Sequence, residues 1–157
     1  MAMNDLYQDF PGYKAGSLVE ADRFIRHRFV EICSDVLARV NRCYDQSREK
    51  GKLKLASEIE QVKRRLAKLE REIEERELSY LPPFLKEGIA SVDHEKLSDV
   101  DHAIYDVFQK CTRNLEGLTC HEQDMHIIDR FTSINSLLRE IEGKCHERMK
   151  LLKMEKK

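Results

Sequence analysis

The stretch "IEQVKRRLAKLEREI", residues 59–73, decides the fold. Apolar residues within it and just before it recur in alternating steps of four and three, the 3.5-residue period of a helix that packs along one narrow stripe. The stretch therefore predicts a long helix with a coiled-coil-like seam that another helix must cover. The residues of this seam are Leu55, Ile59, Val62, Leu66, Leu69 and Ile73.

Charged residues border the seam. Arg64 and Arg65 stand side by side, and Glu60 lies four residues before Arg64. Opposite charges at this spacing face each other on a helix surface and stabilise it modestly. The two arginines are therefore interpreted first as the charged border of a packing helix, and second as a pair that contacts phosphate.

The composition of the whole chain favours the same architecture. Its 157 residues are 36% charged and include only six glycines and three prolines, which indicates long helices with few interruptions. Apolar residues make up 41%, enough to build a real core in one domain. The formal net charge of −1 gives no general attraction to nucleic acid or to an anionic membrane, so either would need a local patch.

Local signals place the helix boundaries. Ser17 begins a capping box, Gly51 is a natural stop, and Ser98 with Asp101 three residues later is expected to begin the third helix. A diproline at residues 82–83 cannot continue the second helix. The predicted elements are an irregular arm over residues 1–16, helices over about 17–50, 54–80, 98–116 and 119–155, and a hinge over 82–97.

We therefore predict an all-α fold, an antiparallel bundle of about four helices that forms one domain over residues 17–157. The first helix pairs with the second and the third with the fourth, which makes two helical hairpins. Three helices are expected to be long and the third about half their length, so that part of the first hairpin extends as a coiled-coil-like arm. Aromatic residues at three-residue spacing in the N-terminal arm, Phe10 and Tyr13 among them, are expected to dock on this bundle.

Two Cys-His-Glu units recur on the last predicted helix. They are 25 residues apart, which is about 37 Å along a helix, so one chain cannot close a metal site from both. Antiparallel pairing of this helix with a second copy would bring thiolate and imidazole groups together, which are ligands that zinc prefers. Chance recurrence in an amphipathic helix is the simpler interpretation. The candidate ligands are Cys120, His121, Cys145 and His146.

Two basic stretches suggest a nucleic-acid patch. The segment "RFIRHRF", residues 23–29, mixes arginines with aromatic rings, as proteins that bind single strands do. A second basic excess runs over residues 48–71. Acidic residues near both stretches weaken the case for nucleic-acid binding. The candidate residues are Arg23, Arg26, Arg28, Lys63, Arg64, Arg65 and Lys68.

The function expected from these patterns is that of a non-enzymatic, cytoplasmic module for protein–protein interaction. It would act as an adaptor, or self-associate into a homodimer or larger assembly through the seam. We found no nucleophile elbow, phosphate-binding loop or zinc-protease motif, and we expect no cofactor and no membrane partner. The alternative is a small accessory protein that binds nucleic acid through the basic stretches.

Overall fold

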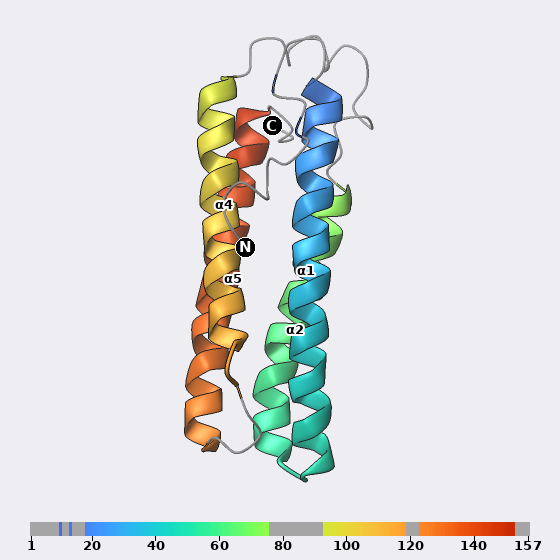
Figure 1. The fold of residues 1–157 in the computed structure, drawn as a ribbon, viewed down its shortest axis with the longest axis vertical. Coiled ribbons are helices and arrows are strands. Elements are labelled where there is room, and N and C mark those ends of the chain that lie inside the picture. The colour runs from blue at the N-terminus through green and yellow to red at the C-terminus, as the bar shows by residue number, and fades with distance from the viewer. Residues whose placement is uncertain (1–9, 11–12, 14–17, 76–92, 119–122, 153–157) are drawn as a thin grey trace.

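The computed structural model describes residues 10, 13, 18–75, 93–118 and 123–152. Long helices run side by side along the longest axis of the molecule (Figure 1). The described ranges contain no strand, and the all-α bundle predicted from the sequence is confirmed. The helices are α1 (Leu18–Glu49), α2 (Leu53–Glu75), α4 (His94–Leu115) and α5 (Asp124–Leu151).

The helices form a four-membered ring. The main neighbours of α1 are α2 and α4, and the main neighbours of α5 are α4 and α2. The α1–α2 and α4–α5 hairpins are each antiparallel, whereas α1 runs parallel to α4 and α2 runs parallel to α5 (Figure 1). The two predicted hairpins therefore pack face to face, with α2 diagonally opposite α4.

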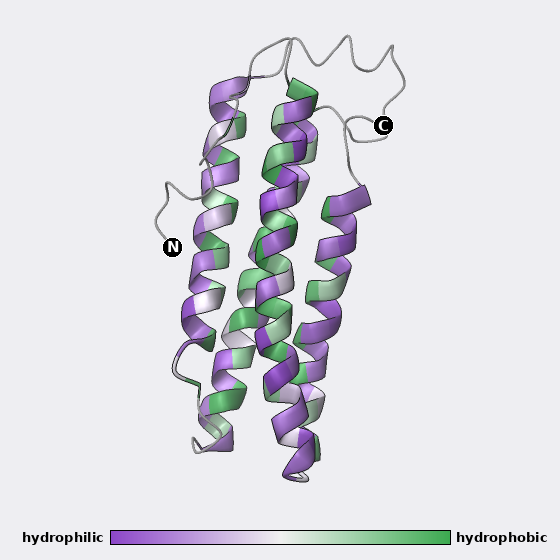
Figure 2. Ribbon diagram, turned by 45° about the vertical axis from the view of Figure 1, so that its right-hand side comes forward, coloured by the Kyte–Doolittle hydropathy of each residue, from purple (hydrophilic) through white to green (hydrophobic). Residues whose placement is uncertain are grey.

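The core is made from one apolar face of each helix. Apolar faces turn inward and polar faces turn outward along the bundle (Figure 2). Phe29 of α1 and Phe108 of α4 are buried there, with ring centroids 6.0 Å apart. Burial of this apolar surface is the main force that holds the helices together.

The seam on α2 lies inside this core. Each of its six residues, from Leu55 to Ile73, is at most 6% exposed within the single chain. The prediction that another helix covers the row is thus met by helices of the same chain. In the closed bundle these side chains offer no surface to a second copy, so a surface for self-association has to lie elsewhere.

Glycine ends two of the helices. Gly51 follows α1 with φ of 72°, and Gly117 follows α4 with φ of 74°, a left-handed conformation that other residues rarely adopt. At the first of these turns, the backbone N–H groups of Gly51 and Lys52 donate to carbonyl oxygens of the last turn of α1. Both stops agree with the sequence.

The start of the third helix was predicted wrongly. The helix begins at His94, because the Asp93 side chain accepts a hydrogen bond from the Lys96 backbone N–H at 3.1 Å and caps it. Ser98 and Asp101 therefore lie within α4, and the hinge predicted over 82–97 is helical from residue 94. The longer start gives α4 22 residues, close to the 23 of α2.

Other predicted boundaries fall partly outside the described residues. These include the end of the second helix over 76–80, the diproline and the proposed start of the last helix at 119–122. Within the described chain, α5 begins at Asp124, and the Gln123 side chain makes no capping hydrogen bond. None of the helices described is both long and apolar enough to cross a membrane.

Candidate functional site

Four charged side chains occupy core positions near the end of the bundle where α1 and α4 begin. Asp22 and Arg26 lie on α1, Asp101 on α4 and Arg148 on α5. The two aspartates are 0% exposed and the two arginines 6% exposed. Charged groups are rarely buried unless they are paired. We call these four residues the charge cluster.

Arg148 is the centre of the charge cluster. Its Nη1 lies 2.6 Å from Oδ1 of Asp22, and its Nε donates to Oδ1 of Asp101 at 2.7 Å. The Asp22 contact is an ion pair without hydrogen-bond alignment, and neither oxygen of Asp22 accepts a hydrogen bond from the described residues. One guanidinium thus joins α5 to both α1 and α4.

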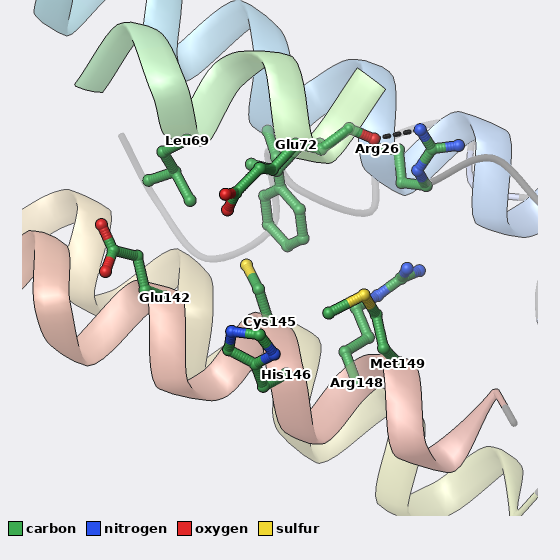
Figure 3. A pocket seen from close by; sticks show the side chains of 10 residues that line it. Arg26, Leu69, Glu72, Glu142, Cys145, His146, Arg148 and Met149 are labelled. Carbon is green, nitrogen blue, oxygen red and sulfur yellow. Dashed lines mark hydrogen bonds between the residues drawn. The ribbon is translucent and has the colours of Figure 1, made fainter. Parts of the chain in front are cut away.

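Arg26 connects the cluster to α2. Its Nη2 donates to the backbone carbonyl of Ile73 (Figure 3). The same nitrogen donates to the carbonyl of Glu74 at 2.6 Å, and Nη1 lies 3.8 Å from Asp22. A cation at a helix C-terminus satisfies free carbonyls and interacts well with the helix dipole. The sequence interpretation of Arg26 as a nucleic-acid contact is therefore wrong, because its guanidinium is buried against α2.

The N-terminal arm reaches the same cluster. The Tyr13 hydroxyl donates to Oδ2 of Asp101 and accepts a hydrogen bond from Nη2 of Arg148 at 3.4 Å. Phe10 packs edge-on against Tyr13, with centroids 5.1 Å apart, and lies 5.6 Å from the ring of Phe24 on α1. These two aromatic residues of the arm dock on their own bundle, as the sequence analysis expected.

Opposing effects set the ionisation of the cluster. Burial raises the pKa of Asp101, while the charge of Arg148 and the hydrogen bond from Tyr13 act to lower it. Burial acts to lower the pKa of Arg148, but the charges of Asp101 and Asp22 outweigh it and raise that pKa well above the ordinary value. The pairing therefore keeps Arg148 charged, and together with Arg26 it places two cations beside the two buried carboxyl groups. A buried ion cluster of this kind adds little net stability, because the cost of desolvation offsets most of the attraction between its charges.

A small cavity lies beside the cluster between α1, α2 and α5. Its volume is about 40 Å³, room for a water molecule or two. Cys145 of α5 points across it toward α2, into the space that also holds the Glu72 side chain (Figure 3). Burial raises the pKa of the Cys145 thiol to about 12, so the group is protonated near neutral pH and is a poor nucleophile.

The candidate metal ligands are only partly described. Cys145 is half-buried on the cavity, and the adjacent His146 is exposed and lines the same cavity. Cys120 and His121 lie outside the described residues. Among the residues that are described, no group of three or more histidine, cysteine, aspartate or glutamate side chains is arranged to hold a metal ion.

The candidate nucleic-acid residues divide over different surfaces. Arg28 stacks over Phe24 at 5.2 Å from the ring centroid and lies 3.6 Å from Glu31. Lys63 lies over the ring of Tyr44 on α1, 4.7 Å from its centroid. Arg23 is exposed on α1. These residues therefore do not continue the surface formed by the remaining basic residues of α2.

Those remaining residues line an open groove between α2 and α5, which we call the basic groove. Its volume is about 400 Å³. Arg139 was not among the candidates predicted from the sequence, because it is far from the α2 arginines in the chain and joins them only through the packing of α5 beside α2. The residues lining the groove are Gln61, Arg64, Arg65, Lys68, Asn135, Arg139 and Glu142.

The charge cluster was also missed. Its signal in the sequence is a charged residue where the helical period calls for an apolar one, as at Asp101, four residues after Leu97 and three before Ile104. No family model, no curated protein and no solved structure matches the chain. The geometry of its own residues is therefore the basis for assigning a function.

Proposed function

We propose that this chain is a non-enzymatic protein-interaction module, an adaptor whose partner binds its outer surface. The observation that carries the proposal is the basic groove, an open surface of about 400 Å³ built from two helices of the closed bundle. A rigid scaffold suits an adaptor because the free chain already holds the binding surface in its bound shape. The charge cluster joins four helices and the arm at one end of the bundle.

The chemistry of the described thiols supports a non-catalytic role. Burial raises the pKa of Cys33, Cys43, Cys111 and Cys145, which keeps each thiol protonated near neutral pH. Thiol catalysis requires the opposite shift. The largely apolar cavity beside the cluster is also far smaller than the roughly 300 Å³ at which ligand pockets begin.

Nucleic-acid binding is the second candidate, favoured by the convergence of Arg64, Arg65, Lys68 and Arg139 on one groove. It is the weaker candidate because the groove runs from residue 61 to residue 68 of α2, about 10 Å along the helix. Nucleic-acid binders commonly neutralise about six to ten phosphates. A surface of this length reaches few of them.

Site-specific photo-crosslinking tests the proposal. A photoreactive phenylalanine derivative replaces Gln61 in the basic groove, and in a matched control it replaces Gln109, which lines the groove between α1 and α4. In extract of the native cells, treated or untreated with nuclease, we expect the residue-61 probe to yield a discrete protein adduct that the residue-109 probe does not.

The identity of the adduct distinguishes the alternatives. An adduct of twice the chain mass identifies the partner as a second copy, and sedimentation velocity at micromolar concentrations should then show a dimer. An adduct that disappears after nuclease treatment supports nucleic-acid binding instead. Equal labelling from both positions, or none from either, contradicts an interaction surface in the basic groove.

A further inference from the structure

The basic groove carries an excess of positive charge that the chain does not fully neutralise. Four cationic side chains and one carboxylate line it, although the whole chain has a formal net charge of −1. Three of the cations lie on α2, and Arg139 faces them from α5. Charge has thus been concentrated on this surface by the packing of α2 against α5.

The ion pairs that three cations of the groove already make with nearby carboxylates are weak enough to exchange. Arg64 lies 3.1 Å from Glu60, Arg65 lies 3.6 Å from Glu142, and Lys68 lies 3.9 Å from Glu72. All of these side chains are at least 28% exposed, and solvent-exposed pairs contribute little to stability. An incoming carboxylate can therefore replace a resident one at small cost to the fold.

Arg139 is the strongest anchor for such a group. No carboxylate of the described residues lies within ion-pair distance of its guanidinium. A planar guanidinium binds a carboxylate through two parallel hydrogen bonds, which makes the pair strong and oriented. The amides of Gln61 and Asn135 line the same groove and can both donate to and accept from the polar side chains of a bound segment.

We propose that the basic groove binds a short acidic segment of a partner protein, with its carboxylates on Arg139, Arg65 and Lys68. The inference rests on the proposed function and names the chemistry of the partner. Glu60 and Glu72 stand at either end of the basic stretch of α2. A long polyanion laid along the groove would meet these two acids, whereas a short acidic segment fits between them.

Fluorescence anisotropy with defined probes tests this inference. The probe is a labelled helical peptide of about twelve residues with glutamates at i and i+4 spacing, and its control carries glutamines at the same positions. A labelled single-stranded oligonucleotide of random sequence is the competing ligand. We expect the acidic peptide to bind at least about tenfold more tightly than both, with an affinity that falls as salt rises.

Charge reversals locate the binding surface. Arg139→Glu should weaken binding of the acidic peptide by about tenfold or more, while Arg113→Glu, an exposed change of the same kind in the groove between α1 and α4, should alter it less than about twofold. Circular dichroism checks that each variant is folded. Lys68→Glu is a second groove variant with the same expected direction.

Three results would overturn the inference. They are equal affinity for the glutamine peptide, tighter binding of the oligonucleotide than of the acidic peptide at the same ionic strength, and equal loss from Arg139→Glu and Arg113→Glu. If any of these results is obtained while the probe at residue 61 still crosslinks to a protein, the proposal of an acidic partner is wrong. The proposal that the basic groove is an interaction surface is then unaffected. If the probe at residue 61 yields no protein crosslink, the proposed function itself is contradicted.

Discussion

Arg148 pairs with two buried carboxylates, those of Asp22 and Asp101. Removing one partner of a buried ion cluster leaves charge without compensation in a medium of low dielectric constant, which costs about 3–5 kcal/mol. We predict that Arg148→Met lowers the free energy of unfolding by about 3 kcal/mol near neutral pH, measured by urea denaturation. Lys150→Met, an exposed change two residues later, should stay within about 0.5 kcal/mol of the parent.

The effect of Arg148→Met should depend on pH, with a sign set by Asp101. Burial raises the pKa of Asp101, and losing the opposing charge of Arg148 raises it further. The folded chain then holds this proton at pH values where the unfolded chain, with a carboxyl pKa of about 4, has released it. The contribution of Asp101 to the stability of the variant is therefore complete below the pKa of its carboxyl in the unfolded chain. It is lost as the pH rises through the pKa of the same carboxyl in the folded chain.

Relative to the parent protein, the variant should accordingly recover stability when the pH is lowered from neutrality to about 5. Asp101→Asn added to Arg148→Met should remove part of this pH dependence, because the titrating carboxyl is gone. The same loss of stability at both pH values, or no effect of Asp101→Asn on the pH profile, would show that Asp101 is not responsible.

Buried thiols give a second test at individual positions. Burial raises the pKa of both Cys111 and Cys145 to about 12. Because only the thiolate is alkylated, we expect iodoacetamide to modify both at least about a hundredfold more slowly in the folded chain than in urea. Mass spectrometry of the peptides measures each cysteine separately. Rapid modification of Cys145 in the folded protein would contradict its placement at the cavity.

Two glycines, one within a helix and one at a helix end, affect stability in opposite directions. Gly143 lies within α5, and a Cβ atom added there meets nothing within 4 Å. Gly51 follows α1 with a positive φ, where any side chain is strained. We predict that Gly143→Ala raises the free energy of unfolding by about 0.5–1 kcal/mol, and that Gly51→Ala lowers it by about 1 kcal/mol.

Thermal or urea denaturation of the two variants, each compared with the parent, measures both effects. Changes of the same sign in the two variants would contradict this account of the helices. Gly143→Ala also preserves the basic groove, because residue 143 is not among those that line it, and should leave binding of the acidic peptide unchanged.

Closure of the bundle within one chain can be tested through Leu66. The residue is 0% exposed, so Leu66→Ala should cost about 2–5 kcal/mol, whereas Leu53→Ala, at a residue 73% exposed, should cost less than about 0.5 kcal/mol. Because α1 and α5 of the same chain cover the seam, the denaturation midpoint of the Leu66 variant should not change with protein concentration. A midpoint that rises with concentration would mean that association with a second chain adds to the stability of the fold.

The sequence determined the local properties of this protein. The helical period identified the six seam residues and the apolar faces, because residues three and four apart share a face of any helix. Gly51 ended its helix as expected, because glycine adopts the left-handed conformation of such a turn more readily than other residues. The start of α4 is also a local property, although it was predicted wrongly. Asp93 caps the helix, whereas the prediction that Ser98 begins it placed Asp101, which is buried, in the first turn of the helix.

Only the tertiary structure decided which helices became neighbours. Apolar stripes are alike, so their pattern does not state that α2 packs beside α5 or that α4 lies diagonally opposite α2. That choice brought Arg139 to the basic groove, carried Arg148 to Asp22 and Asp101, and buried Arg26 at the end of α2. Burial of the apolar faces supplied the energy for this packing, and the charged residues at core positions are paired within it because an uncompensated buried charge is costly.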